Sequence, residues 1–144
     1  MKTVPLKAAT EVPSDPQPLF ATAVRAGFPS PADDFVETPL DIHDYLVKHP
    51  AATFFARAEG DSMIGLGIHD GDLLIVDRAL QPRHGDVVIA AIDGELTCKV
   101  LDLQSRLLRA GNRRYPPIEL HDSADLLIEG VVIHSVRHHR CSRW

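Results

Sequence analysis

The fold follows from one stretch, Asp86-Val87-Val88-Ile89-Ala90-Ala91-Ile92-Asp93-Gly94-Glu95-Leu96-Thr97-Cys98-Lys99-Val100-Leu101. Two runs rich in apolar and β-branched residues flank Asp93-Gly94, a dipeptide that favours a two-residue hairpin turn because glycine accepts a positive φ. The sequence therefore predicts a β-hairpin with strands at residues 86–92 and 95–101. Successive side chains of a strand point to opposite faces, so Thr97, Lys99 and Leu101 share one face of the second strand.

Further strand signals lie on both sides of this hairpin. Short runs rich in apolar, aromatic or β-branched residues, bounded by turn residues, occupy residues 53–58, 72–77, 106–110, 118–121 and 126–136. Gly130 interrupts the last run, which predicts a bulge or kink there. Many short strands and a single helix predict a mostly β fold, in the form of a twisted, partly closed β-sheet assembly.

The N-terminal third differs in composition from the rest. Eight of the 11 prolines fall within the first 50 residues, and proline disfavours the interiors of helices and sheets. We therefore expect residues 1–37 to form an extended N-terminal arm and residues 38–144 to form the folded domain. Thr38-Pro39-Leu40-Asp41 predicts the start of one short helix, with Thr38 as its cap, that ends by His49 because Pro50 follows.

Composition limits the classes of function. The chain has 144 residues, of which 44% are hydrophobic and 24% charged, and this fits one soluble globular domain. A formal net charge of −5 argues against strong direct binding to nucleic acid. No apolar run is long enough to cross a membrane and no secretory signal is recognised, so we expect a cytoplasmic protein without a membrane partner. Cys98 and Cys141 fit no metal-binding spacing, and we expect free thiols, no metal and no cofactor.

Two residues could carry chemistry, Ser62 and Lys99. A serine hydroxyl is a weak nucleophile at neutral pH and needs a nearby base. A lysine can serve as that base when burial lowers its pKa, and the apolar neighbours of Lys99 favour such burial. Cys98 points to the opposite face of the strand and is expected to pack in the core. The residues alone leave an alternative open, in which Ser62 only forms a turn and Lys99 is a solvated strand residue.

Four motifs stand out along the chain: Gly60-Asp61-Ser62-Met63, Asp70-Gly71-Asp72-Leu73-Leu74-Ile75-Val76-Asp77, Gly85-Asp86-Val87-Val88-Ile89-Ala90-Ala91, and Asp93-Gly94-Glu95 with Lys99. With these motifs the chain resembles the LexA/UmuD family of self-cleaving serine–lysine peptidases, peptidase family S24, and its UmuD-type members most. The resemblance extends from about Phe20 to Ile133 and implies a LexA/signal-peptidase-like fold.

The resemblance also assigns roles to individual residues. It implies that Ser62 is the nucleophile and Lys99 the general base. It implies that the backbone N–H groups of Asp61 and Ser62 form the oxyanion hole. The scissile bond would join Ala26 to Gly27, two small residues within the Pro-rich arm.

A cellular role follows from the same resemblance. It implies an SOS-response protein whose self-cleavage is stimulated by a RecA–ssDNA filament, and whose shortened homodimer is the accessory subunit of a UmuC-type Y-family DNA polymerase in error-prone translesion synthesis. Only 26 residues precede Gly27, which we expect to be too few for the DNA-binding module of a LexA-type repressor. The alternatives are a LexA-type repressor fragment, a signal-peptidase-like enzyme and a non-catalytic β-rich dimerisation module. We expect the basic, His-rich segment 136–144 to be a solvated tail and not a metal site.

Overall fold

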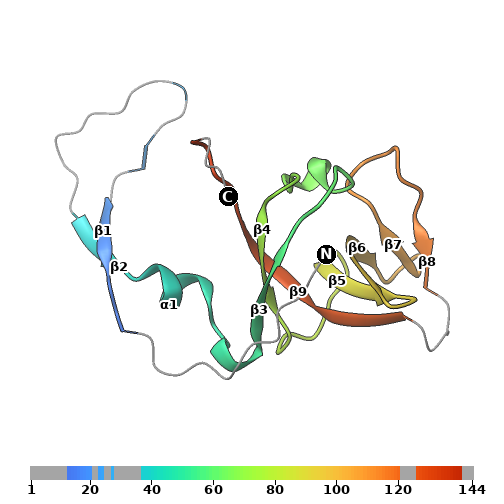
Figure 1. Ribbon diagram of the computed structural model, residues 1–144, viewed down its shortest axis with the longest axis horizontal. Coiled ribbons are helices and arrows are strands. Elements are labelled where there is room, and N and C mark those ends of the chain that lie inside the picture. The colour runs from blue at the N-terminus through green and yellow to red at the C-terminus, as the bar shows by residue number, and fades with distance from the viewer. Residues whose placement is uncertain (1–12, 21–22, 25–26, 28–36, 121–125, 141–144) are drawn as a thin grey trace. The chain divides into compact units, whose positions relative to one another are not determined.

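The structure, a computed structural model, describes residues 13–20, 23–24, 27, 37–120 and 126–140. It divides into two compact units, one of residues 9–48 and one that contains residues 49–144. Within the described ranges, no helix has the length and apolar character needed to cross a membrane. The strands and the helix of both units are labelled in Figure 1.

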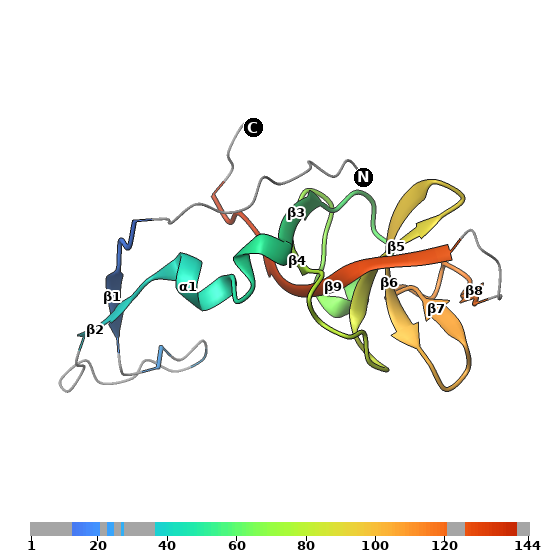
Figure 2. The same ribbon diagram turned by 90° about the horizontal axis from the view of Figure 1, so that it is seen from below.

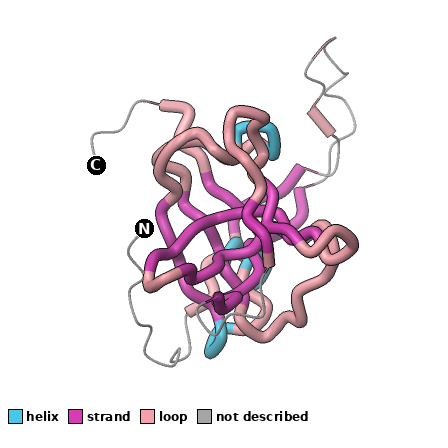
Figure 3. Tube along the Cα trace, turned by 90° about the vertical axis from the view of Figure 1, so that its right-hand side faces the viewer, coloured by secondary structure: helices cyan, strands magenta, loops and turns pink. Residues whose placement is uncertain are grey.

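The larger unit is built on one seven-stranded antiparallel sheet. In spatial order its strands are β3 (Thr53–Arg57), β4 (Leu73–Asp77), β9 (Leu126–Val136), β5 (Val87–Ile92), β6 (Glu95–Asp102), β7 (Leu107–Arg109) and β8 (Ile118–Glu119). The long β9 runs between β4 and β5 (Figure 2), and the strands curve around one another instead of lying flat (Figure 3). The sheet remains open at β3 and β8, and the predicted mostly β fold is confirmed.

The predicted hairpin is present, with its two-residue turn at Asp93 and Gly94. β5 and β6 pair from Val87 opposite Val100 to Ile92 opposite Glu95. The two turn residues have positive φ values, 50° at Asp93 and 80° at Gly94, as a tight hairpin turn of the mirror-image type requires. Local sequence therefore suffices to place Lys99 on the second strand of this hairpin.

β9 is the longest strand and connects the two halves of the sheet. It pairs with β5 through residues 126–131 and with β4 through residues 131–136, and each pairing contains one register shift. The first shift lies beside Gly130, where a Cβ atom would stand 2.7 Å from Cγ1 of Val76. The predicted irregularity at Gly130 is confirmed, and the side chain of Val76 on β4 leaves no room for a Cβ atom at Gly130. The second shift, near Ile133, has no signal in the local sequence.

The core consists of two apolar clusters of the larger unit. One includes Phe54, Met63, Leu74, Val76, Ile89 and Cys98. The other includes Val88, Ala90, Leu101, Leu108 and Val131. Neighbouring residues of β5 and β6 fall into different clusters, because alternate side chains of a strand point to opposite faces. Cys98 is a buried free thiol in this core, as expected, and Cys141 lies outside the described residues.

The smaller unit corrects the predicted start of the helix. Residues 38–40 belong to β2 (Glu37–Leu40), which pairs with β1 (Gln17–Phe20), and the helix α1 spans Ile42–Leu46. The Thr38 hydroxyl donates to the carbonyl of Leu19 across this pair and is not a helix cap. Asp41 caps the helix instead, because its carboxylate accepts the N–H groups of His43 and Asp44 at 3.0 and 3.3 Å. Two short 3₁₀ helices, Pro50–Ala52 and Ile64–Leu66, belong to the larger unit.

The contact at Gly130 gives a stability prediction. Gly130→Ala should lower the free energy of unfolding by about 1–3 kcal/mol, because the new methyl group overpacks against Val76 and the carbonyl of Asp77. Urea denaturation measures the difference. Leu127→Ala, at an exposed position of the same strand, should change the value by at most about 0.5 kcal/mol. A Gly130→Ala variant as stable as the parent chain would contradict the packing explanation.

Candidate active site

Ser62 lies in a turn that follows β3 and precedes the short 3₁₀ helix Ile64–Leu66. Hydrogen bonds with other residues of the same loop hold both ends of the turn. The N–H of Gly60 donates to the Asp70 carboxylate at 2.8 Å. The carbonyl of Met63 accepts the N–H of Leu66 at 3.0 Å and that of Ile68 at 3.3 Å. Because Met63 and Ile68 are buried in the core, the serine is carried by an anchored turn and not by a loose loop.

Lys99 reaches this turn from β6. Its Nζ atom lies 3.3 Å from Oγ of Ser62, although the two residues are 37 positions apart in the sequence. The same nitrogen donates to Oγ1 of Thr97 at 3.0 Å and to the carbonyl of Cys98 at 3.1 Å. Thr97 shares the strand face of Lys99, as the alternation predicts, and the lysine is only 8% exposed. The fold therefore brings the two predicted residues into contact, and Lys99 is not a solvated strand residue.

The surroundings of Lys99 favour its neutral form. Burial lowers its pKa below the ordinary value of 10.5, because an ammonium group loses its hydration there. The three hydrogen-bond acceptors of Nζ are neutral oxygens and offer no counter-charge. Burial also raises the pKa of the Cys98 thiol to about 11, so this neighbour stays protonated and does not hold a positive charge on the lysine. A buried neutral amine within reach of a serine hydroxyl is suited to act as a general base.

The oxyanion hole was predicted from the backbone N–H groups of Asp61 and Ser62. Within the described part of the chain, neither the N–H of Asp61 nor that of Ser62 donates a hydrogen bond. Both N–H groups therefore remain predicted donors to the oxyanion.

A loop after β7 packs against the serine turn. Nδ2 of Asn112 donates to the carbonyl of Asp61 at 3.1 Å, and the hydroxyl of Tyr115 donates to the Asp61 carboxylate. The N–H of Gly65 donates to the carbonyl of Gly111 at 2.6 Å. A Cβ atom at Gly65 would lie 2.3 Å from that oxygen, so only glycine permits this approach. Residues 111–115, called here the 111–115 loop, thus support the turn from a distant part of the sequence.

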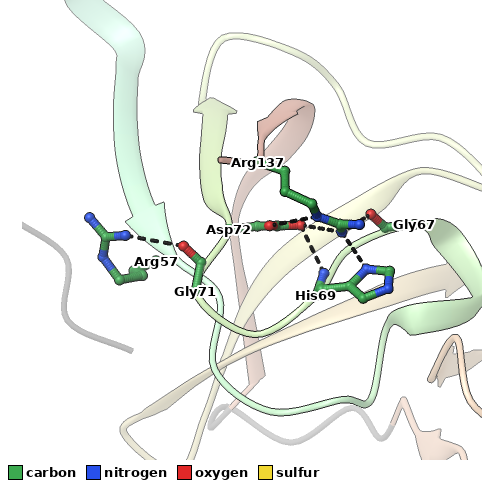
Figure 4. Close-up of polar contacts among 6 residues, drawn as sticks. All are labelled: Arg57, Gly67, His69, Gly71, Asp72 and Arg137. Carbon is green, nitrogen blue, oxygen red and sulfur yellow. Dashed lines mark hydrogen bonds and ion pairs between the residues drawn. The ribbon is translucent and has the colours of Figure 1, made fainter. Parts of the chain in front are cut away.

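Arg137 holds the far end of the serine loop, as Figure 4 shows. Its Nε and Nη2 atoms donate to the two oxygens of Asp72 at 3.1 and 2.7 Å, and Nη2 also donates to the carbonyl of Gly67 at 2.7 Å and contacts His69. Asp72 is 4% exposed and also accepts the N–H of His69. The expectation that segment 136–144 is a solvated tail is therefore wrong for Arg137, which connects the end of β9 to the start of β4.

Comparison with known proteins identifies the family. The model of the Peptidase S24-like family matches residues 18–133 of the chain. The chain belongs to the peptidase S24 family. It is 46% identical over 135 residues to Protein ImpA of Escherichia coli, covering 89% of this chain and 93% of ImpA. It is 49% identical over 124 residues to Protein SamA of Salmonella typhimurium (83% and 86% of the two chains), and 43% identical over 124 residues to Protein MucA of Escherichia coli (85% of each).

These relatives are UmuD-family proteins, so the resemblance to the LexA/UmuD family is confirmed. Membership of the S24 family supports a serine-peptidase activity, and the UmuD-like relatives support a role in the SOS response.

The structure describes only one of the two residues that flank the predicted scissile bond. Gly27 is described, but Ala26 lies outside the described residues, so the scissile bond between them stays a prediction. Among the described residues, no group of three or more His, Cys, Asp or Glu side chains is arranged to hold a metal ion. Nothing in the local sequence singles out Asn112, Tyr115 or Arg137, because each acts through a residue more than 50 positions away.

The Arg137–Asp72 contact gives a second prediction. Arg137→Ala should lower the free energy of unfolding at pH 7 by about 1–3 kcal/mol, because it leaves a buried carboxylate without its main partner. Arg140→Ala, an exposed arginine three residues further on, is the matched control and should have little effect.

The pH dependence of this loss has a defined sign. The Arg137 guanidinium lowers the pKa of Asp72 below its usual value, so the contact stabilises the fold above the pKa of an unfolded aspartate, about 3.9. The stabilisation disappears as pH falls through the lower pKa of the folded state. Urea denaturation at pH 7 and at acidic pH should therefore show a difference between parent and variant that shrinks in acid. An unchanged difference would contradict the ion-pair assignment.

Proposed function

We propose that this protein is a self-cleaving serine–lysine endopeptidase of the SOS response. The observation that carries the proposal is the 3.3 Å contact between Nζ of the buried Lys99 and Oγ of Ser62. Family membership supports the reaction class. The substrate is the Ala26–Gly27 bond in the arm of residues 1–37, and residues 38–144 supply the peptidase and dimerisation domain.

The reaction follows acyl-transfer chemistry. The neutral amine of Lys99 takes the proton of the Ser62 hydroxyl while Oγ attacks the carbonyl carbon of Ala26. The N–H groups of Asp61 and Ser62 stabilise the negative charge that develops on the carbonyl oxygen. The protonated lysine then gives its proton to the departing amine of Gly27, which leaves Ala26 bound to Ser62 as an ester. Water hydrolyses the ester and restores both side chains.

Thr97 has a supporting role in this scheme. Its hydroxyl lies 3.0 Å from Nζ of Lys99 and, as a neutral acceptor, directs the amine without holding a proton on it. A carboxylate at the same place would raise the pKa of the lysine and keep it charged. The choice of a hydroxyl is therefore consistent with a lysine that must be neutral to act.

The cellular role is proposed from the UmuD-like relatives. A RecA–ssDNA filament stimulates cleavage in the cytoplasm. The shortened homodimer then serves as the accessory subunit of a UmuC-type Y-family polymerase. The net charge of −5 supports an action through protein partners and not through strong direct DNA binding.

Self-cleavage is the direct test. Incubation of the full chain at alkaline pH should yield a fragment that begins at Gly27, measured by intact mass. Ser62→Ala and Lys99→Ala should each slow its appearance by about 10²–10⁴-fold, because each removes one partner of the proton transfer. Ser105→Ala and Lys48→Ala, at exposed positions outside the site, are the controls.

The pH profile has a defined direction. The rate should rise with pH as Lys99 loses its proton, and because burial lowers its pKa, the midpoint should lie below 10.5. Equal cleavage in the Ser62→Ala and Lys99→Ala variants would overturn the dyad, whereas no cleavage of the parent chain would favour the non-catalytic dimerisation module. A fragment that begins at Gly111, after the second Ala-Gly pair of the chain, would overturn the assignment of the scissile bond.

The partner prediction is tested with the same readout. Adding RecA, single-stranded DNA and a nucleotide should increase the rate at neutral pH, where the chain alone should cleave more slowly than at alkaline pH. RecA without DNA is the control, since the filament and not the free protein is the proposed partner. If cleavage occurs at alkaline pH but the filament changes nothing at neutral pH, the dyad stands and the SOS partner assignment fails.

A further inference from the structure

The peptide bond between Asp61 and Ser62 joins a proposed oxyanion donor to a carbonyl that the fold holds in place. The C=O of Asp61 and the N–H of Ser62 belong to one planar, trans unit and point in opposite directions. Whatever fixes the direction of the carbonyl therefore fixes the direction of the N–H. The carbonyl has two hydrogen-bond donors, Nδ2 of Asn112 at 3.1 Å and the N–H of Ile64 at 3.4 Å. Asn112 makes the shorter contact, and it comes from outside the turn.

The amide of Asn112 is itself held in one orientation. Its Oδ1 atom accepts the N–H of Arg114 at 3.1 Å, which leaves Nδ2 as the end that faces Asp61. Its backbone carbonyl accepts the N–H of Tyr115 at 3.1 Å. On the preceding residue, the N–H of Gly111 contacts Sδ of Met63 at 3.3 Å. The donor is thus part of a small rigid loop and not a mobile surface side chain.

Tyr115 adds a second connection to the same residue. Its hydroxyl donates to the carboxylate of Asp61, so the loop holds both the backbone and the side chain of Asp61. The Asp61 carboxylate raises the pKa of Tyr115, so the phenol keeps its proton further into the alkaline range. The Tyr115 contact therefore persists to higher pH than a tyrosine with an ordinary pKa would allow.

We propose that Asn112 is a positioning residue for self-cleavage, whose side-chain amide orients the Ser62 N–H toward the developing oxyanion. It does not touch the scissile bond and acts through the carbonyl of Asp61. This inference rests on the proposed function, because it assumes that Ser62 attacks a carbonyl. Asn112 sets the direction of a backbone N–H donor, which the side chains of Ser62 and Lys99 do not set.

The first test compares cleavage rates. Asn112→Ala removes the donor, and Asn112→Asp keeps the side-chain shape but presents an oxygen that cannot donate to the Asp61 carbonyl. Both variants should cleave about 10–100-fold more slowly, because a misdirected oxyanion donor is lost in part or completely. In Asn112→Ala the midpoint of the pH profile should not move, because this substitution adds no charge near Lys99. Arg113→Ala, an exposed neighbour on the same loop, is the control and should cleave at the parent rate.

A second measurement separates positioning of the donor from general damage to the turn. In a Ser62→Cys background, iodoacetamide alkylates the thiolate at a saturated carbon and releases iodide, so no oxyanion forms. Peptide mass mapping reports the modification at position 62 separately from Cys98 and Cys141. Adding Asn112→Ala to this background should leave the alkylation rate unchanged.

The outcomes are distinguishable. Slower self-cleavage with unchanged alkylation supports the proposal. Self-cleavage at the parent rate in both Asn112 variants overturns it and leaves the proposed function intact. A parallel loss of cleavage and alkylation also overturns it, because Asn112 would then hold the whole turn and not direct one N–H. Absence of Ser62-dependent cleavage in the parent chain instead refutes the proposed function, and this inference with it.

Discussion

Burial of the Lys99 amine beside the Ser62 hydroxyl is the interaction on which the site depends. A charged ammonium group without a counter-ion is costly in a protein interior, and the group relieves the cost by giving up its proton more readily. The structure enforces this outcome, since the acceptors around Nζ are all neutral oxygens. The hairpin of β5 and β6 contributes the rest, because it carries the lysine into the middle of a curved sheet where water has little access.

The serine turn is held by a residue of its own loop and by two distant parts of the chain. Asp70 holds its start through the N–H of Gly60, and the 111–115 loop contacts it through Asp61 and Gly65. Arg137 holds the end of the loop through Asp72. A nucleophile and its base need to stay within a few tenths of an ångström of a productive arrangement, and packing supplies this more reliably than a single hydrogen bond. The supporting residues therefore matter to the proposed chemistry although none of them is expected to react.

A site of this kind has a particular use when its substrate belongs to the same chain. The proposed bond at Ala26–Gly27 lies in a Pro-rich arm, where small residues on both sides leave the carbonyl accessible. Each chain would then cut once and remain changed, so the lysine acts as a base for one event and not for repeated turnover. Under this proposal, the partner determines when the single cut occurs.

Local sequence determined the hairpin, the strand face shared by Thr97 and Lys99 and the irregularity at Gly130, because turn preference and alternation act between near neighbours. The family resemblance named Ser62 and Lys99. The local sequence predicted Thr38 as the helix cap. This prediction was wrong because Thr38 lies in β2, and only the fold reveals the pairing of β2 with β1. The 3.3 Å dyad contact, the ion pair of Asp72 with Arg137 and the support of Asp61 by Asn112 were decided by tertiary structure alone. Their partners are 37, 65 and 51 positions apart, and no local preference can specify which distant side chain arrives at a given turn.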